Sequence, residues 1–365
     1  LLLQNIDKLI YISILAVFAA STVMKSDYIG VIALFTTFLT IVKLLFVKGE
    51  ELKPSKAELW LLAYFMIVII SLAGSSLFVL SFKGFLKTLT YMGFYLSIAH
   101  FLRKNTDKIL PIAKEWQSRP LEEVYAVVFM DAIHYHVRYE GRIVKKAVYI
   151  AIGINLDGRK DVLGMWVGEN ESAKFWLSVL NGLKNRGVND ILIACIDGLS
   201  GFTNAIEAVF PQTEIQQCII HQIRNTTKYV SYKDIKALMA DLKRVYAAVD
   251  EDTALQELDR FDEIWGGKYP KLADNWRDKW VHLSTYFKYP QAVRTLIYTT
   301  NTIEGFNRQL RKVTKNKGVF PTDDSLFKML YLAMMDITKK WTGRRRDWGE
   351  IHSQLEIFFA DRISY

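Results

Sequence analysis

The sequence predicts two unlike parts: three or four hydrophobic, transmembrane-like helices over residues 1–104, and an α/β domain over residues 105–365. The first part holds long runs without a charged residue, whereas in the second part strand-like segments alternate with amphipathic helical ones. With 51% hydrophobic and 23% charged residues, the 365-residue composition excludes a disordered or fibrous chain. Two cysteines are too few for a disulfide scaffold or a four-cysteine zinc site.

Four runs without a charged residue support the prediction of transmembrane-like helices in residues 1–104. The longest has 22 residues, and a helix that spans a membrane needs about 20. A signal peptide would explain only the first run, and a set of buried core helices is the alternative. We therefore expect membrane insertion through residues 1–104. The runs are Leu9–Met24, Ile29–Val42, Leu59–Leu80 and Thr88–Leu102.

The second part begins near the charged segment at 103–108 and reads as an α/β layer. Its strand-like segments are rich in β-branched and aromatic residues, and the helix near 172–184 stops at Asn185-Arg186-Gly187. Three strands, a helix, a strand, a helix and a strand form the order of the ribonuclease-H-like fold. The predicted strands are 124–133, 142–155, 161–169, 191–197 and 215–223, and the predicted helices are 172–184 and 202–209.

Helical patterns continue after the last strand. Residues 231–292 contain three tryptophans and look like a helical insertion, and a further helix is predicted from about Thr302. Ile303, Phe306, Leu310 and Val313 recur at helical spacing and are expected to form its core stripe. Another face of that helix carries one acidic residue among cations: Glu304, Arg308, Arg311 and Lys315.

The net charge of +9 does not by itself indicate a nucleic-acid-binding protein. Residues 1–104 hold 10 Lys+Arg and 5 Asp+Glu, and residues 105–365 hold 37 and 33. Each part is only mildly basic, so an argument for DNA binding has to come from local sites.

Three carboxylates form a candidate site for phosphodiester chemistry. Asp131 and Asp197 lie at the ends of strands that are neighbours in a ribonuclease-H-like sheet, and Glu304 could close the site from the late helix. Such chemistry needs carboxylates that hold two divalent cations about 3.5–4 Å apart. Each residue also has a structural explanation: a polar strand end for Asp131, a turn or cap for Asp197, and a capping box with Asn301 for Glu304.

Residues from about 105 to 365 resemble the catalytic part of the Mutator-type transposases of bacterial insertion sequences. The resemblance lies in EWQSRPLEEVYAVVFMDAIHYHVR, LDGRKDVLGMWVGENESAKFW, IDGLSGFTNAIEAVFPQTEIQQCIIHQIRN and FKYPQAVRTLIYTTNTIEGFNRQLRKVTKNKGVF, in that order. It implies a ribonuclease-H-like domain with an Asp131-Asp197-Glu304 triad that binds Mg²⁺ or Mn²⁺. It also implies cleavage and strand transfer at DNA ends, in the cytoplasm, by a chain that is a homo-oligomer when active.

Other residues in this part suggest supporting roles. Cys218 and His221 fit a Cys-x₂-His signature of the family; we assign them no metal and expect them to brace the strand beside the acidic site. Trp265 and Trp280 could stack on an extruded base, but core packing is the favoured interpretation. Candidate DNA contacts are Arg224, Asn225, Arg308, Arg311, Lys312, Lys315, Lys317 and the run Arg344-Arg345-Arg346, for which a solvated basic face is the alternative.

The first part departs from the family, which has a DNA-binding region of helix-turn-helix type before its catalytic domain. The hydrophobic runs stand in that place and resemble, weakly, the first spans of a polytopic O-antigen ligase or polymerase. Our hypothesis is a transposase that lacks its N-terminal DNA-binding region, fused to the start of a membrane protein. The alternative is a membrane-protein fragment fused to an inactive transposase remnant.

Overall fold

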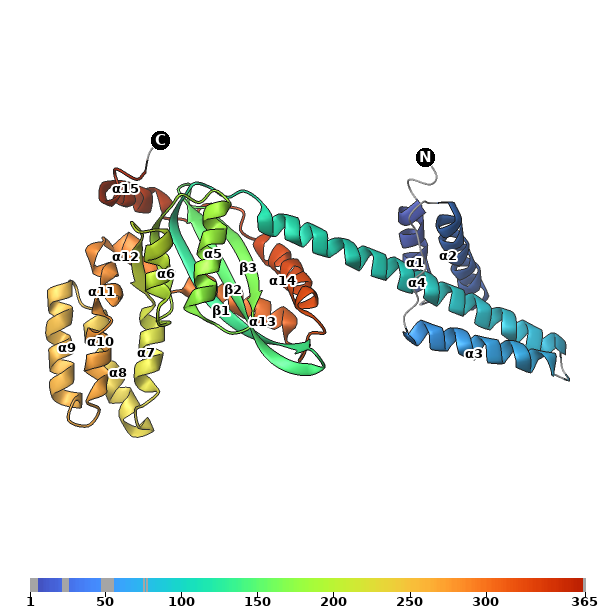
Figure 1. Ribbon diagram of the computed structural model, residues 1–365, viewed down its shortest axis with the longest axis horizontal. Coiled ribbons are helices and arrows are strands. Elements are labelled where there is room, and N and C mark those ends of the chain that lie inside the picture. The colour runs from blue at the N-terminus through green and yellow to red at the C-terminus, as the bar shows by residue number, and fades with distance from the viewer. Residues whose placement is uncertain (1–5, 22–25, 47–55, 75, 77, 364–365) are drawn as a thin grey trace. The chain divides into compact units, whose positions relative to one another are not determined.

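The computed structural model describes residues 6–21, 26–46, 56–74, 76 and 78–363 (Figure 1). The chain divides into two compact units, Leu1–Pro111 and Ile112–Tyr365, and each unit is described by itself. The boundary predicted at residues 104 and 105 falls within a long helix, α4 (Phe78–Ser118).

The first unit consists of α1 (Ile6–Ser21), α2 (Ser26–Phe46), α3 (Lys56–Ala73) and most of α4. Ile6, Ile10 and Ile14 recur every four residues on α1, so they share one face of the helix. With Leu39 of α2 they form a buried cluster, against which Phe94, Ile98 and Phe101 of α4 pack. Other apolar side chains of these helices are exposed, among them Val31, Trp60 and Ile70.

The four uncharged runs fall largely on these helices, but the structure does not support the predicted membrane spans. Among the described residues, we find no helix that combines the length and the apolar character needed to cross a bilayer. The 22-residue run does not form one helix, since α3 ends at Ala73, Gly74 lies in a turn and α4 begins at Phe78. Residues 22–24, at the end of the first run, lie outside the described residues.

The second unit is a mixed α/β structure built on a five-stranded sheet of order β3-β2-β1-β4-β5. The strands β1 (Val124–Tyr139), β2 (Arg142–Asn155) and β3 (Lys160–Gly168) are antiparallel neighbours. On the other side of β1, β4 (Asp190–Ile196) and β5 (Glu214–Gln217) continue the sheet in parallel. The predicted order of strands and helices is confirmed through β5.

Helices cover the sheet and bury its central strands. On one face lie α5 (Ala173–Asn185) and α6 (Phe202–Val209), whose apolar residues join those of the sheet in one core cluster (Figure 1). Ser172 caps α5 by accepting a hydrogen bond from the N–H of Phe175. The helices α13 (Asn301–Thr314) and α14 (Asp323–Thr338) contact β1 and β3, respectively. Cys195 of β4 is fully buried, as expected of a core residue.

The turn between β2 and β3 is fixed by the C-terminal part of the chain. Gly158 has φ +78°, and a Cβ there would meet the Trp348 ring at 2.3 Å, so only glycine fits without a shift. The Trp348 indole N–H donates to the carbonyl of Leu156 at 2.8 Å. Trp348 begins α15 (Trp348–Phe358), which ties this helix to the hairpin.

Two predictions of local structure were wrong. The predicted strand 215–223 ends at Gln217, because β4 ends at Ile196 and offers no further partners; α7 (Ile219–Thr227) follows. Cys218 and His221 therefore do not share a strand. In α13, Val313 is exposed, whereas Asn307 and Thr314 are buried beside Ile303, Phe306 and Leu310.

Helices fill the chain between α7 and α13, in the region where an insertion was predicted. They are α8 (Tyr232–Tyr246), α9 (Glu251–Trp265), α10 (Lys271–Arg277), α11 (Trp280–Leu283), the 3₁₀ helix η1 (Thr285–Lys288) and α12 (Gln291–Ile297).

Candidate active site

The parallel pairing of β1 and β4 brings Asp131 and Asp197 together. Phe129 pairs with Cys195, and side chains alternate between the faces of a strand, so the next positions on the same face are Asp131 and Asp197. Asp131 accepts hydrogen bonds from the amide of Asn307, at 2.6 Å, and from the backbone N–H of Ala132, at 2.7 Å. Both carboxylates are thus placed by the sheet.

Glu304 reaches the same place from the first turn of α13. The capping-box interpretation does not hold, since the N-cap residue is Thr300 and its side chain makes no capping hydrogen bond. Thr300 instead donates to the sulfur of Cys218 at 3.1 Å, and Glu304 accepts from Arg224 at 3.0 Å. The Glu304 side chain is therefore directed into the site.

The helix α7 supplies two cations that face the carboxylates. His221 and Arg224 are three residues apart and lie on one face of the helix. His221 Nδ1 lies 2.8 Å from Asp197 Oδ1, and its Nε2 lies 3.7 Å from Glu304 Oε1. The predicted role of His221 as a brace for a strand is thus replaced by direct contact with the acidic residues.

These residues line one cleft of about 380 Å³, which we call the carboxylate cleft. All three predicted carboxylates belong to it, as do three predicted DNA contacts, Arg224, Arg308 and Arg311. Lys312, Lys315 and Lys317 are exposed elsewhere on or after α13 and do not line the cleft. Its remaining lining residues are Ala132, Ile133, His221 and Asn307.

Sequence reasoning missed two polar residues of this site. Asn307, which binds Asp131, lies three residues after Glu304, and this helical spacing was the signal that could have identified it. Burial raises the pKa of the Glu171 carboxyl, and the negative charge of nearby Asp197 raises it further. No pattern in the sequence singled out Glu171, because the loop before α5 has no periodicity.

Burial and charge perturb the acid–base groups of the cleft. Burial, and then the negative charge of Asp197, raise the pKa of Asp131 to about 7. Burial opposes protonation of His221, but contacts with Asp197 and Cys218 outweigh it and raise the His221 pKa to about 10. At neutral pH His221 is thus a cation that compensates Asp197.

The raised pKa of Asp131 predicts a pH dependence of stability. Between about pH 4 and 7 the folded chain holds a proton that the unfolded chain has released. The free energy of unfolding should therefore fall as the pH rises through this window in metal-free buffer, and Asp131→Asn should lack this part of the fall. Chemical denaturation of both proteins at pH 5 and pH 8 measures the difference. An equal change in the two proteins would contradict the assignment.

The donor set of the cleft suits a hard divalent cation. Asp131, Asp197 and Glu304 offer carboxylate oxygens, the ligands that Mg²⁺ prefers, and the repulsion between the two aspartates is what a cation relieves. Among the described residues, however, no three His, Cys, Asp or Glu side chains converge closely enough to hold an ion. His221 and Arg224 provide the positive charge next to Asp197 and Glu304.

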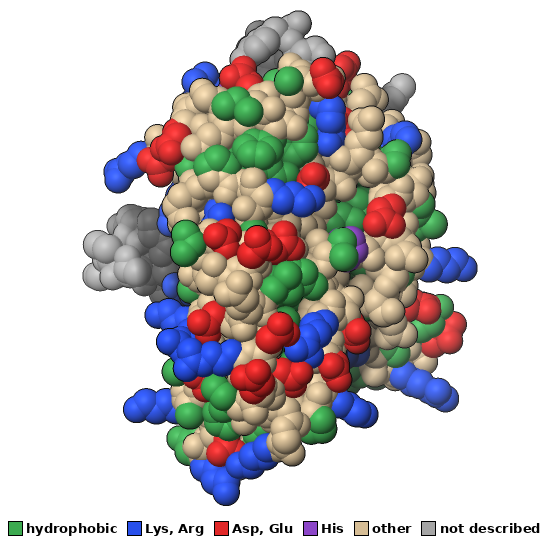
Figure 2. All heavy atoms as spheres, turned by 90° about the vertical axis from the view of Figure 1, so that its left-hand side faces the viewer, with side chains coloured by type: hydrophobic (Ala, Val, Ile, Leu, Met, Phe, Trp, Pro, Cys, Tyr) green, Lys and Arg blue, Asp and Glu red, His purple; other side chains and the backbone are tan. Residues whose placement is uncertain are grey.

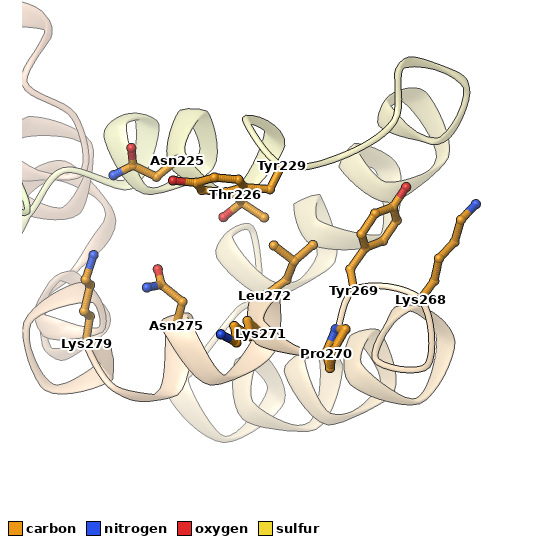
Figure 3. Close-up of a pocket in the computed structure, with 10 residues that line it drawn as sticks. All are labelled: Asn225, Thr226, Tyr229, Lys268, Tyr269, Pro270, Lys271, Leu272, Asn275 and Lys279. Carbon is orange, nitrogen blue, oxygen red and sulfur yellow. The ribbon is translucent and has the colours of Figure 1, made fainter.

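A second and larger pocket, of about 660 Å³, lies beside α7 (Figure 3). Asn225, Thr226 and Tyr229 face it from α7 and the residues after it, and residues 268–279 form the opposite wall. Asn225, a predicted DNA contact, therefore lines this pocket and not the carboxylate cleft. Trp265 and Trp280, for which core packing was favoured over base stacking, are half-buried. The indole N–H of Trp265 donates to Asp241 and that of Trp280 to Glu251, both at 2.9 Å.

One face of the second unit, on the side of the helical insertion, carries charges of both signs. Figure 2 shows acidic and basic side chains mixed over this face. Arg277 pairs with Asp259 and Asp262 at 2.9 and 2.7 Å, so some of these charges are compensated within the insertion.

Comparison with known proteins assigns the chain to a family. The profile of the family described as "Transposase, Mutator family" matches residues 90–343, which is more than half of the chain. The chain belongs to the Mutator family of transposases. The match begins inside α4, before the predicted boundary at residue 105, and includes the whole carboxylate cleft.

Several curated transposases are similar to the chain. The chain is 46% identical over 259 residues to the transposase for insertion sequence element ISRM3 of Rhizobium meliloti, covering 71% of this chain and 65% of that protein. It is 40% identical over 279 residues to a probable transposase of Corynebacterium diphtheriae, covering 71% and 81%. The transposase for IS256 in transposon Tn4001 of Staphylococcus aureus is 28% identical, covering 68% and 64%. The chain thus spans slightly less than two thirds of the length of the ISRM3 transposase.

Proposed function

We propose that this chain is a DNA transposase with a ribonuclease-H-like catalytic domain and a divalent-metal-dependent Asp-Asp-Glu site. The observation that carries the proposal is the carboxylate cleft, which three acidic residues, 66 and 107 positions apart in the sequence, line together with cationic side chains. The names of the relatives, all transposases for insertion sequence elements, support DNA as the substrate.

Each residue of the cleft has a role in this proposal. Asp131, Asp197 and Glu304 would hold Mg²⁺ or Mn²⁺, which would supply the positive charge that activates an attacking oxygen and stabilises a leaving oxygen of the phosphodiester. Asn307 orients Asp131 by donating to its carboxylate at 2.6 Å. Arg308 and Arg311 follow Glu304 on the same side of α13, where their guanidinium groups can bind phosphate oxygens.

His221 and Arg224 act as counter-ions of the metal-free cleft. They pair with Asp197 and Glu304, which would otherwise repel each other in a partly buried site. Once DNA enters, Arg224 is free to turn toward a phosphate, since its side chain is 58% exposed. The homo-oligomer expected of the active protein stays a prediction.

Removal of metal tests the proposed function directly. Purified chain is mixed with labelled duplex DNA that carries the terminal repeats of the element, in buffer with Mg²⁺, Mn²⁺ or EDTA. We expect nicked and strand-transfer products with Mg²⁺ or Mn²⁺ and none with EDTA. Equal nicking with EDTA would rule out the metal-dependent mechanism, and the same repeats with scrambled sequence serve as the control for end recognition.

A further inference from the structure

A small, strongly basic pocket lies apart from the carboxylate cleft, and we call it the arginine pocket. It has a volume of about 270 Å³, and four of its lining residues are cationic: Lys160, Lys340, Arg344 and Arg345. Trp341 and Thr302 line it too, and none of its lining residues is acidic. Arg346, the third member of the arginine run, does not line it.

The pocket is held by contacts to the sheet and to α13. The backbone N–H of Arg345 donates to the carbonyl of Gly158 at 3.2 Å, which ties the loop to the turn between β2 and β3. The ring of Trp341 lies 5.8 Å from that of Phe306, a buried residue of α13. Lys160 Nζ lies 5.1 Å from the centre of the Trp341 ring. These contacts hold Arg345, Trp341 and Lys160 at the wall of the pocket.

The cations of this pocket have no acidic partner among the residues that the structure describes. In the part of the chain that the structure describes, none of its four cations forms a salt bridge. The Nε of Arg345 is buried and has no hydrogen-bond partner among these residues. Burial, and then the charge of Arg345, lower the pKa of Lys160. Like charges in so small a space repel one another, and an anion would relieve that repulsion.

The N-terminus of α13 adds to the attraction for an anion. Thr302 belongs to its first turn, and the N-cap residue Thr300 makes no side-chain capping hydrogen bond there. Glu304 lies two residues further along the same turn and faces the carboxylate cleft. An anion in the arginine pocket would therefore lie close to the residue that closes the acidic site.

We propose that the arginine pocket binds one phosphate of the DNA backbone and so positions a nearby phosphodiester in the carboxylate cleft. The inference rests on the proposed function, because it takes DNA as the substrate. The ligand is a backbone phosphate group, whose oxygens accept hydrogen bonds from the planar guanidinium of arginine. It gives affinity and register without reading the base sequence.

The salt dependence of DNA binding tests this proposal. Binding of the full chain to a fluorescent duplex is measured by anisotropy over a series of NaCl concentrations in EDTA, so that the DNA is not cut. Loss of one phosphate contact lowers the slope of log K against log [salt] by about 1, which weakens binding about tenfold at 0.1 M salt. We expect this change for Arg345→Gln. We expect it also for Lys160→Gln, because Lys160 lines the pocket from the sheet.

Arg346→Gln is the matched control, because it removes the same charge one residue outside the pocket. It should keep the slope of the wild type, and an equal effect of Arg346→Gln and Arg345→Gln would overturn the proposal in favour of a general basic field. The double variant Lys160→Gln/Arg345→Gln should lose about 1 in slope and not 2, because one phosphate is shared. An additive loss would contradict the shared contact.

Two further results separate this proposal from neighbouring ones. In the first, inorganic phosphate raises the melting temperature of the wild type but not of Arg345→Gln, while the two proteins have the same slope of log K for DNA against log [salt]. The pocket then binds free phosphate, and the proposal is wrong. If metal-dependent cleavage is intact while both pocket variants keep the wild-type slope, the pocket fails and the proposed function stands. Absence of any cleavage by the wild type counts against the proposed function instead.

Discussion

Asp131→Asn is expected to lower DNA cleavage by about a thousandfold or more, equivalent to about 4 kcal/mol of transition-state stabilisation. The substitution keeps the size of the side chain but removes the charge that a divalent cation requires. Because burial and Asp197 already disfavour that charge in the metal-free chain, the variant should fold at least as stably as the wild type at pH 8. The loss would thus be one of chemistry and not of folding.

The measurement is the initial rate of nicking of labelled terminal-repeat DNA, with the melting temperature of each protein recorded alongside. Glu304→Gln should show a similar loss of rate, since its side chain enters the same cleft from α13. Asp336→Asn is the matched control, because that carboxylate is 79% exposed on α14 and does not line the cleft. Wild-type rates in Asp131→Asn would refute the triad.

The largest effect on folding is expected for Trp176→Ala. Trp176 is fully buried in the core between the sheet and α5, with its ring 4.4 Å from that of Phe202 and 4.9 Å from that of Tyr149. Truncating a buried tryptophan costs about 3–5 kcal/mol, since it removes apolar contacts and leaves a cavity. For a unit of this size each kcal/mol lowers the melting temperature by about 2–4 °C.

We therefore expect Trp176→Ala to melt about 10 °C below the wild type in calorimetry or circular dichroism. Trp176→Phe keeps an aromatic ring against Phe202 and Tyr149, so its loss should be clearly smaller. Equal melting temperatures of Trp176→Ala and wild type would show that this cluster does not control the stability of the second unit.

Most strands and helices of the second unit could be predicted because their signals are local. β-branched runs such as 124–133 and the amphipathic helix near 172–184 need only their own side chains to be recognised. The prediction failed at 215–223, where Ile219 and Ile220 suited a strand as well as a helix. The end of β4 at Ile196 removed the pairing partner, and no local signal shows where a neighbouring strand ends.

The hydrophobic first unit shows the opposite weakness of local patterns. Counting uncharged residues from Leu59 to Leu80 gives a run long enough for a membrane span. The chain divides that run between α3 and α4 at Gly74, so its length does not become the length of a helix. Composition was a good guide to helix formation there and a poor guide to helix boundaries.

The amino-acid order was sufficient to predict an α/β domain, its order of strands and helices through β5, and three carboxylates that could share a site. Residues 131, 197 and 304 stand at positions that local periodicity and strand ends identify. The partners of these carboxylates were not predictable, because they depend on contacts between distant segments. His221 meets Asp197 since α7 replaces a strand, and Asn307 meets Asp131 across 176 residues of chain. Likewise, Arg345 and Lys160 form one pocket while Arg346 lies outside it, because the turn at Gly158 fixes the loop. Such selection among similar charges comes from packing geometry, which no spacing within the sequence encodes.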